Sequence, residues 1–210
     1  FTAFLQSEDA RRLLQGKPVI TLIACRNMWL MAQEEMKKLL KEVDAHLVGN
    51  AVLIDEAGSL WSLLATPIWV LSGRKGPTLG GLIPRAGVAE AAIRACDRFG
   101  ARLLERFRAG ENLQGDVLQG LDAVCVDEKL ILSERTARRG FRVWGGLIRA
   151  SGPHGAWQRK PILAVYAVFL FVFLLTFVPV TMVVKKIMAP FMRRQIQEQK
   201  DYFSQLSGAE

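Results

Sequence analysis

The chain has 210 residues, half of them hydrophobic, and a formal net charge of +8. A chain of this length can bury one sizeable core and an accessory segment. Its three cysteines show no CxxC or other paired spacing, which argues against a disulfide framework and a metal site and favours reduced thiols. The GxSxG, P-loop and HExxH motifs are absent, which argues against the enzyme classes that those motifs mark.

The N-terminal half alternates between buried strands and an amphipathic helix. The β-branched run Pro18–Cys25 is typical of a central parallel strand. Apolar residues then recur at three- and four-residue spacing from Trp29 to Val43, which predicts a helix with polar residues such as Gln33 turned outward. A second strand is predicted over His46–Asp55.

An apolar insertion follows over residues 57–86, with Trp61 and Trp69 in its centre, Leu60–Leu71. Three interpretations fit it: a cover over a cofactor edge, a segment that dips into a membrane interface, or a cap on the domain. The next apolar periodicity predicts a helix over Val88–Phe107.

This order of strands and helices predicts a right-handed βαβ layout, part of a doubly wound parallel α/β sheet, over residues 1–110. Two strands do not complete such a sheet, even with a third over Leu121–Asp127. We therefore expect further strands before Phe1 that are missing from this chain, in keeping with its non-methionine start.

Over residues 111–160 the sequence predicts a basic, membrane-proximal linker and helix. Between Glu128 and Lys160, eight Lys or Arg residues face two Glu. Because anionic headgroups attract such residues by about 1 kcal/mol each, we expect membrane lipids as partners, and no nucleic acid. A helix within this stretch suits either an interfacial position or packing on the α/β domain.

The C-terminal part is strongly apolar. Ile162–Val184 has no charge over 23 residues, and at about 1.5 Å per residue it is long enough to cross a bilayer. We therefore predict a transmembrane helix over 161–186 in a single-pass membrane protein with a cytoplasmic soluble domain. A buried core helix and a re-entrant hairpin near Pro179 are the alternatives. The amphipathic tail, 187–210, lies on the bilayer or extends the helix into solvent.

The first predicted strand ends in polar residues, where open α/β sheets bind ligands. Arg26 suits a phosphate or carboxylate, and Trp29 a planar ring. Each has a structural alternative: Arg26 as a solvated charge, Asn27 as a helix N-cap, and Trp29 as a core residue. A nucleophilic role for Cys25 is not favoured. The candidate cofactor-binding residues are Ala24, Cys25, Arg26, Asn27, Met28 and Trp29; catalytic residues are not identified.

Three stretches, "KPVITLIACRNMWLMAQE", "TPIWVLSGRKG" and "PRAGVAEAAIRACDRFGARL", followed by the basic stretch and the apolar segment, resemble a bacterial group of flavodoxin-like proteins. Its members are labelled dialkylresorcinol condensing enzyme or NAD(P)H-dependent oxidoreductase. The resemblance implies a partial flavodoxin-like fold, with Pro18–Cys25 as the fourth strand, His46–Asp55 as the fifth and Val88–Phe107 as the last helix. It also implies that Ala24–Trp29 flank a flavin ring.

The resemblance further implies a membrane-anchored oxidoreductase that uses FMN, with NAD(P)H as a donor, on a lipophilic acceptor. A non-catalytic scaffold and the condensing role in the group's label are the alternatives, and a homo-oligomer stays open. In flavodoxin-like folds a loop after the first strand holds the FMN phosphate. That loop would precede Phe1, so we expect FMN binding only together with the missing N-terminal segment.

Overall fold

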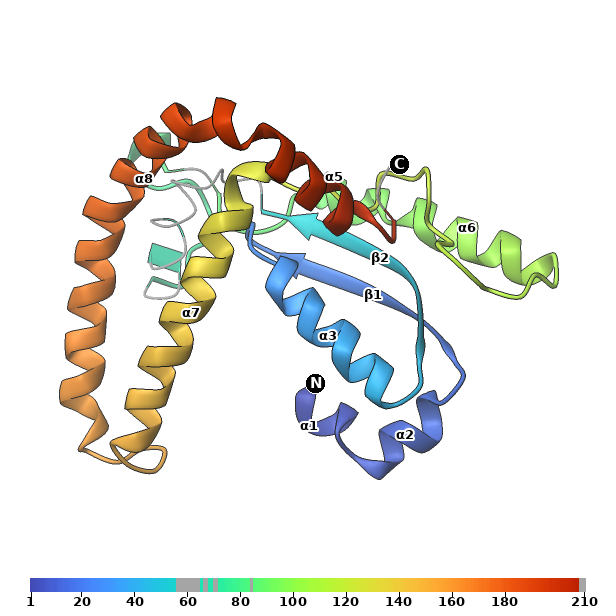
Figure 1. Ribbon diagram of the computed structural model, residues 1–210, viewed down its shortest axis with the longest axis horizontal. Coiled ribbons are helices and arrows are strands. Elements are labelled where there is room, and N and C mark those ends of the chain that lie inside the picture. The colour runs from blue at the N-terminus through green and yellow to red at the C-terminus, as the bar shows by residue number, and fades with distance from the viewer. Residues whose placement is uncertain (56–64, 66–67, 70–71, 84, 208–210) are drawn as a thin grey trace. The chain divides into compact units, whose positions relative to one another are not determined.

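The computed structural model describes residues 1–55, 65, 68–69, 72–83 and 85–207, with only the backbone at 79, 129, 174–175 and 177–193. The chain divides into two compact units (Figure 1). Phe1–Asp127 together with Lys200–Glu210 forms the α/β unit, and Glu128–Gln199 forms the hairpin unit.

The α/β unit contains a parallel pair of strands and several helices. Its elements are α1 (Thr2–Leu5), α2 (Glu8–Leu14), β1 (Pro18–Cys25), α3 (Leu30–Glu42), β2 (His46–Ile54), the 3-10 turn η1 (Leu79–Gly81), α5 (Glu90–Ala95) and α6 (Asp97–Arg108). In the parallel ladder Pro18 lies opposite His46, and Cys25 lies opposite Ile54. The predicted strand–helix–strand segment is thus confirmed, with the second strand ending one residue earlier.

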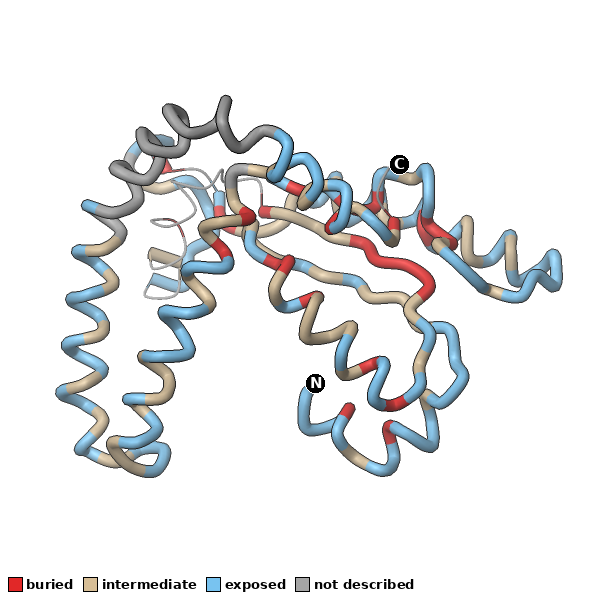
Figure 2. Tube along the Cα trace, in the orientation of Figure 1, coloured by how far each residue is buried: buried red, intermediate tan, exposed pale blue. Residues whose placement is uncertain are grey.

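The main core of this unit lies where β2 meets α6 and the segment 117–123. Its buried residues are Val48, Ala51, Phe99, Val117, Leu118 and Ala123. Figure 2 shows this buried stretch along β2. A Cβ on Gly49 would lie 3.3 Å from Leu118 Cγ and 3.4 Å from Ile20 Cγ1. The missing side chain therefore lets Leu118 pack directly on the strand.

The flavodoxin-like fold prediction is wrong. In the described part of the chain the sheet has two strands, β1 and β2, and no flavodoxin-like multi-strand sheet forms. The outer edge of β2 is covered instead: Val117 N–H donates to Val48 O at 2.8 Å, and Val52 N–H donates to Ala123 O at 2.8 Å. The predicted third strand, Leu121–Asp127, is irregular chain that occupies this edge, so no further strand can pair there.

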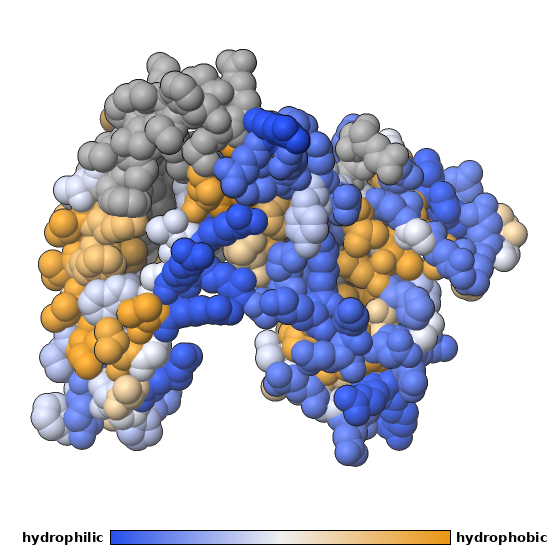
Figure 3. Space-filling view, in the orientation of Figure 1, coloured by the Kyte–Doolittle hydropathy of each residue, from blue (hydrophilic) through white to orange (hydrophobic). Residues whose placement is uncertain are grey.

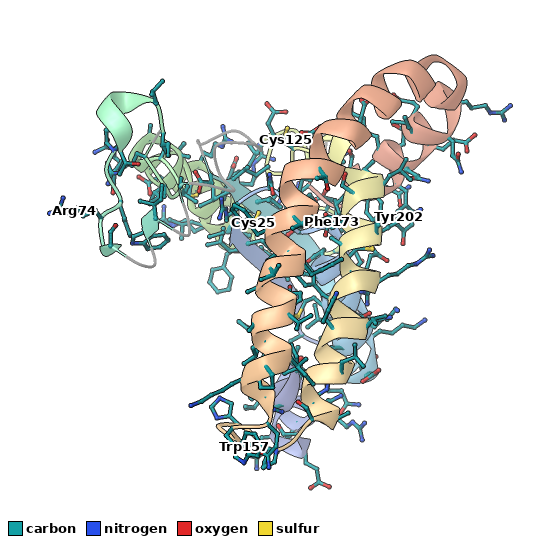
Figure 4. The ribbon with its side chains drawn as sticks, turned by 90° about the vertical axis from the view of Figure 1, so that its left-hand side faces the viewer. Cys25, Arg74, Cys125, Trp157, Phe173 and Tyr202 are labelled. Atoms are coloured by element: carbon teal, nitrogen blue, oxygen red, sulfur yellow. The ribbon has the colours of Figure 1, made fainter. Side chains whose placement is uncertain are left out.

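The hairpin unit is built from two long helices that lie side by side and antiparallel (Figures 1 and 4). They are α7 (Glu128–Ala150) and α8 (Arg159–Ser204), whose last residues belong to the α/β unit. The ring centroid of Trp144 in α7 lies 5.2 Å from that of Tyr166 and 5.0 Å from that of Phe169, both in α8. These aromatic contacts join the two helices near the turn.

The predictions of a transmembrane helix and of a single-pass membrane location are also wrong. Over the residues that the structure describes, no helix combines the length and apolarity that a membrane crossing requires. The charge-free stretch Ile162–Val184 is not a separate span. It is the first part of a 46-residue helix, and its aromatic residues Tyr166 and Phe169 pack on α7.

Three smaller predictions have mixed outcomes. The helix predicted over Val88–Phe107 forms as α5 and α6, divided at Cys96. Most of the insertion centre, Leu60–Leu71, lies outside the described residues, as do the side chains of the tail at 187–193. In the described part of the insertion, Ala65, Ile83 and Ala86 form a small buried cluster.

Candidate functional site

The carboxyl ends of the two strands are tied to the loop before α5. The backbone N–H of Asp55 donates to the carbonyl oxygens of Cys25, at 3.0 Å, and Arg26, at 3.2 Å. The Asp55 carboxylate accepts from Gly87 N–H at 3.0 Å, and Asp55 also bridges to Val88. The region where α/β sheets bind ligands is therefore partly filled by the chain's own loop.

The six predicted site residues do not share one environment. Ala24 and Met28 are exposed, whereas Cys25, Arg26 and Asn27 are half-buried. The Trp29 side chain is only 3% exposed, so it is a core residue and cannot stack on a ligand in this conformation. Asn27 does not cap α3, because the N-cap position is Trp29 and has no side-chain cap. Cofactor binding by these residues stays a prediction.

Arg26 is the predicted residue best suited to bind an anion. Its partial burial lowers the pKa of the guanidinium from its ordinary value, while the negative charge of Asp55 raises it. Because Asp55 already lies within electrostatic reach, the charge of Arg26 is partly balanced inside the protein. An anionic ligand at the strand ends would have to compete with this carboxylate.

Sequence reasoning missed a partly buried series of hydrogen-bonded polar residues that crosses the sheet. Gln33 Nε2 donates to Thr21 Oγ1 at 3.0 Å, and Thr21 Oγ1 donates to Asn50 Oδ1 at 2.8 Å. The backbone N–H of Asn50 donates to Ser207 Oγ at 2.6 Å, and Ser207 Oγ donates to Asp116 Oδ1 at 2.9 Å. Gln33, predicted to face solvent, is thus buried because it has a partner inside the sheet.

Asp116, the last residue of this hydrogen-bonded series, makes the stability of the protein depend on pH. Burial raises the pKa of its carboxyl, while hydrogen bonds from Ser207 and Leu118 and the charge of Arg106 lower it. The folded protein therefore holds the Asp116 proton more tightly than the unfolded chain does. Asp116 therefore contributes to the free energy of unfolding. This contribution is fully present below the pKa that the carboxyl has in the unfolded chain, and it is lost as the pH rises through its pKa in the folded protein.

We expect the variant Asp116→Asn to remove this pH dependence, because the asparagine oxygen still accepts from Ser207 but does not titrate. As pH rises through the acidic range, the free energy of unfolding of the native chain should fall relative to that of the variant. Urea unfolding of both proteins at several pH values measures the difference. If the two free energies of unfolding differed by the same amount at every pH, the raised pKa of Asp116 would be contradicted.

The hairpin unit exposes a large apolar surface on α8. Apart from Phe169, whose ring packs on Trp144, the exposed apolar residues of this helix are Leu163, Val165, Val168, Phe171 and Val172. Val165, Val168 and Val172 recur at three- and four-residue spacing, so they lie on one face. Figure 3 shows hydrophobic side chains gathered along this helix. Because these residues are exposed although large and apolar, the surface is typical of an interaction site. We call it the apolar face of α8.

Exposed apolar residues also occur on α7 and in the turn of the same unit. They are Phe141, Val143, Leu147 and Trp157. Sequence reasoning placed some of these residues in an interfacial helix but did not distinguish exposed from packed positions. Trp144, for example, has its ring contacts inside the hairpin.

The positive charge of the protein is concentrated on the same unit. Between Glu128 and Gln199 the sequence has twelve Lys or Arg and three Glu, a net of +9, so the rest of the chain carries −1 of the total of +8. No Asp or Glu occurs from Arg135 to Gln197. Arg135, Arg138, Arg142 and Arg149 are spaced by three, four and seven residues, which places them on one side of α7.

Comparisons with family models, with curated proteins and with solved structures found no match. The assignment of a function therefore depends on the geometry and charge of the described residues.

Proposed function

We propose that this protein binds the surface of anionic lipid bilayers through its hairpin unit. The observation that carries the proposal is the combination of the apolar face of α8 with a net charge of +9 on one unit. Peripheral proteins bind such surfaces by the same two contributions: buried apolar area and attraction to anionic headgroups. The proposal concerns binding from one side of a bilayer and involves no crossing.

The magnitudes favour lipid over water for this surface. Removing apolar surface from water contributes about 25 cal/mol per Å². Each Lys or Arg near an anionic leaflet adds about 1 kcal/mol. The α/β unit, with a net charge of −1, has no comparable attraction to anionic lipid. Charge and apolar surface thus point to the same unit.

The test is flotation of the full chain with vesicles. We expect binding to vesicles of phosphatidylglycerol mixed with phosphatidylcholine and much weaker binding to pure phosphatidylcholine. Raising the salt towards 1 M, where the Debye length falls to about 3 Å, should weaken binding to the anionic vesicles. Equal binding to both vesicle types would contradict the electrostatic contribution.

Two other outcomes would assign the hairpin surface to different partners. Tight binding to RNA of random sequence without vesicle binding would indicate a nucleic-acid partner. Salt-resistant dimerisation that buries the apolar face of α8 would indicate a second copy of the chain. Either result without vesicle binding would overturn the proposal.

The flavin-dependent redox function and its donor NAD(P)H stay predictions of the family resemblance. Titration with FMN, followed by visible absorbance, of this chain and of a chain extended at its N-terminus tests flavin binding separately from lipid binding; only the extended chain is expected to bind.

A further inference from the structure

The turn between α7 and α8, residues 151–158, is held by its own hydrogen bonds. Ser151 Oγ donates to Ile148 O at 2.7 Å, and Arg159 Nε donates to Gly152 O at 2.8 Å. Gly152 has φ +144°, and a Cβ there would lie 3.2 Å from the Ala156 Cβ. Any other residue would be strained at this position, so glycine suits the conformation of the turn.

Trp157 projects from this turn. Its side chain is 71% exposed, whereas Trp144 packs on the rings of Tyr166 and Phe169. Figure 4 shows Trp157 at the end of the hairpin where the two helices join. The indole ring combines a large apolar body with one N–H donor, which suits the boundary between acyl chains and headgroups.

Cationic side chains lie on both sides of Trp157 in the sequence. Arg149 is in the last turn of α7, and Lys160 is in the first turn of α8; both are exposed. Long cationic side chains can lay their apolar stems along a surface while their charged ends contact phosphate oxygens. Along the sequence, the acidic residues nearest to these cations are Glu134 and Glu198, so no carboxylate of the turn itself competes for them.

Resting on the proposed lipid binding, we infer that the α7–α8 turn is the part of the hairpin that enters the headgroup region of an anionic bilayer. Trp157 is the interfacial anchor, and Arg149 and Lys160 contact the phosphate groups of the phospholipids. The apolar face of α8 begins directly after the turn, at Leu163, and continues the contact.

Affinity measurements on full-length variants form the first test. We expect Trp157→Ala to weaken binding to phosphatidylglycerol vesicles about ten-fold, and Trp157→Phe to weaken it less, because phenylalanine keeps most of the apolar area. Lys160→Gln and Arg149→Gln should each weaken binding roughly five-fold. Inorganic phosphate should weaken binding no more than sodium chloride of the same ionic strength does, because the phosphate contacts depend on the bilayer surface.

Tryptophan fluorescence separates a direct anchor from a structural role. In the native chain, vesicle binding should shift part of the tryptophan emission to shorter wavelength, and lipids brominated near the headgroup should quench that part. The variant Trp157→Phe should lack this part of the emission. The control variant is Trp69→Phe. Trp69 belongs to the α/β unit, where Lys75 Nζ lies 4.8 Å from its ring centroid, so vesicle binding should not change the emission that this variant loses.

The outcomes distinguish this inference from the proposed function. Vesicle binding in which the Trp157 component stays unshifted and unquenched would overturn the anchor while lipid binding stands. Absence of vesicle binding by the native chain would overturn both.

Discussion

Replacing Val168 and Phe171 together with aspartate is expected to abolish most binding to anionic vesicles. These residues are 64% and 63% exposed on α8, so the change removes apolar surface without opening a core. Losing two apolar side chains from a lipid contact, and adding two negative charges beside it, should cost about 3 kcal/mol or more, on the order of a hundred-fold in affinity. Vesicle flotation measures the loss.

A matched control lies on the other unit. Leu104 and Phe107 on α6 are also exposed and three residues apart, at 48% and 76%. The variant Leu104→Asp/Phe107→Asp introduces the same charge at the same spacing outside the hairpin unit, and we expect nearly native binding. If both double variants lost the same amount of vesicle affinity, the loss would reflect the total charge of the protein. The assignment of α8 as the lipid contact would then be wrong.

The variant Leu118→Ala should give the largest loss of stability. Leu118 is fully buried, packs on Gly49 and belongs to the cluster that contains Val48 and Phe99. Removing its buried methyl groups leaves a cavity between β2 and the segment on its outer edge, which should lower the free energy of unfolding by about 3 kcal/mol. Urea unfolding followed by circular dichroism measures the change.

The corresponding surface change is Leu13→Ala on α2, where the leucine is exposed. It should alter the free energy of unfolding by no more than about 0.5 kcal/mol. If Leu118→Ala were as mild as this control, the segment 117–123 would not be part of the core that the structure describes.

The local elements could be predicted because hydrophobic periodicity is a local property. Pro18–Cys25 is a β-branched run and forms β1, and the repeat from Trp29 to Val43 forms α3. The buried position of Gln33 could not be predicted from that repeat. It depends on Thr21 of β1, whose hydroxyl accepts the hydrogen bond from Gln33, and on Asn50 of β2, which in turn accepts from Thr21.

The candidate site could be predicted only in part. The end of β1 was recognisable because parallel strands place their carboxyl ends at one edge. The contact between Asp55 and Gly87 was not, since it depends on a loop that returns 32 residues later. The exposed residues of the hairpin were also beyond sequence reasoning, because an apolar residue has the same hydropathy whether it packs or faces outward.

The sequence alone determined the parallel strand–helix–strand segment, the basic stretch and the helical character of the apolar C-terminal region. Tertiary structure alone decided that the sheet stops at two strands, since Val117, Ala123 and Ser207 occupy the outer edge of β2. It also decided that Tyr166 and Phe169 pack on Trp144, inside a helix much longer than the charge-free stretch. The physical reason is the same in both cases: hydropathy reports how much a segment gains by leaving water, but the surface that receives it is supplied by distant residues.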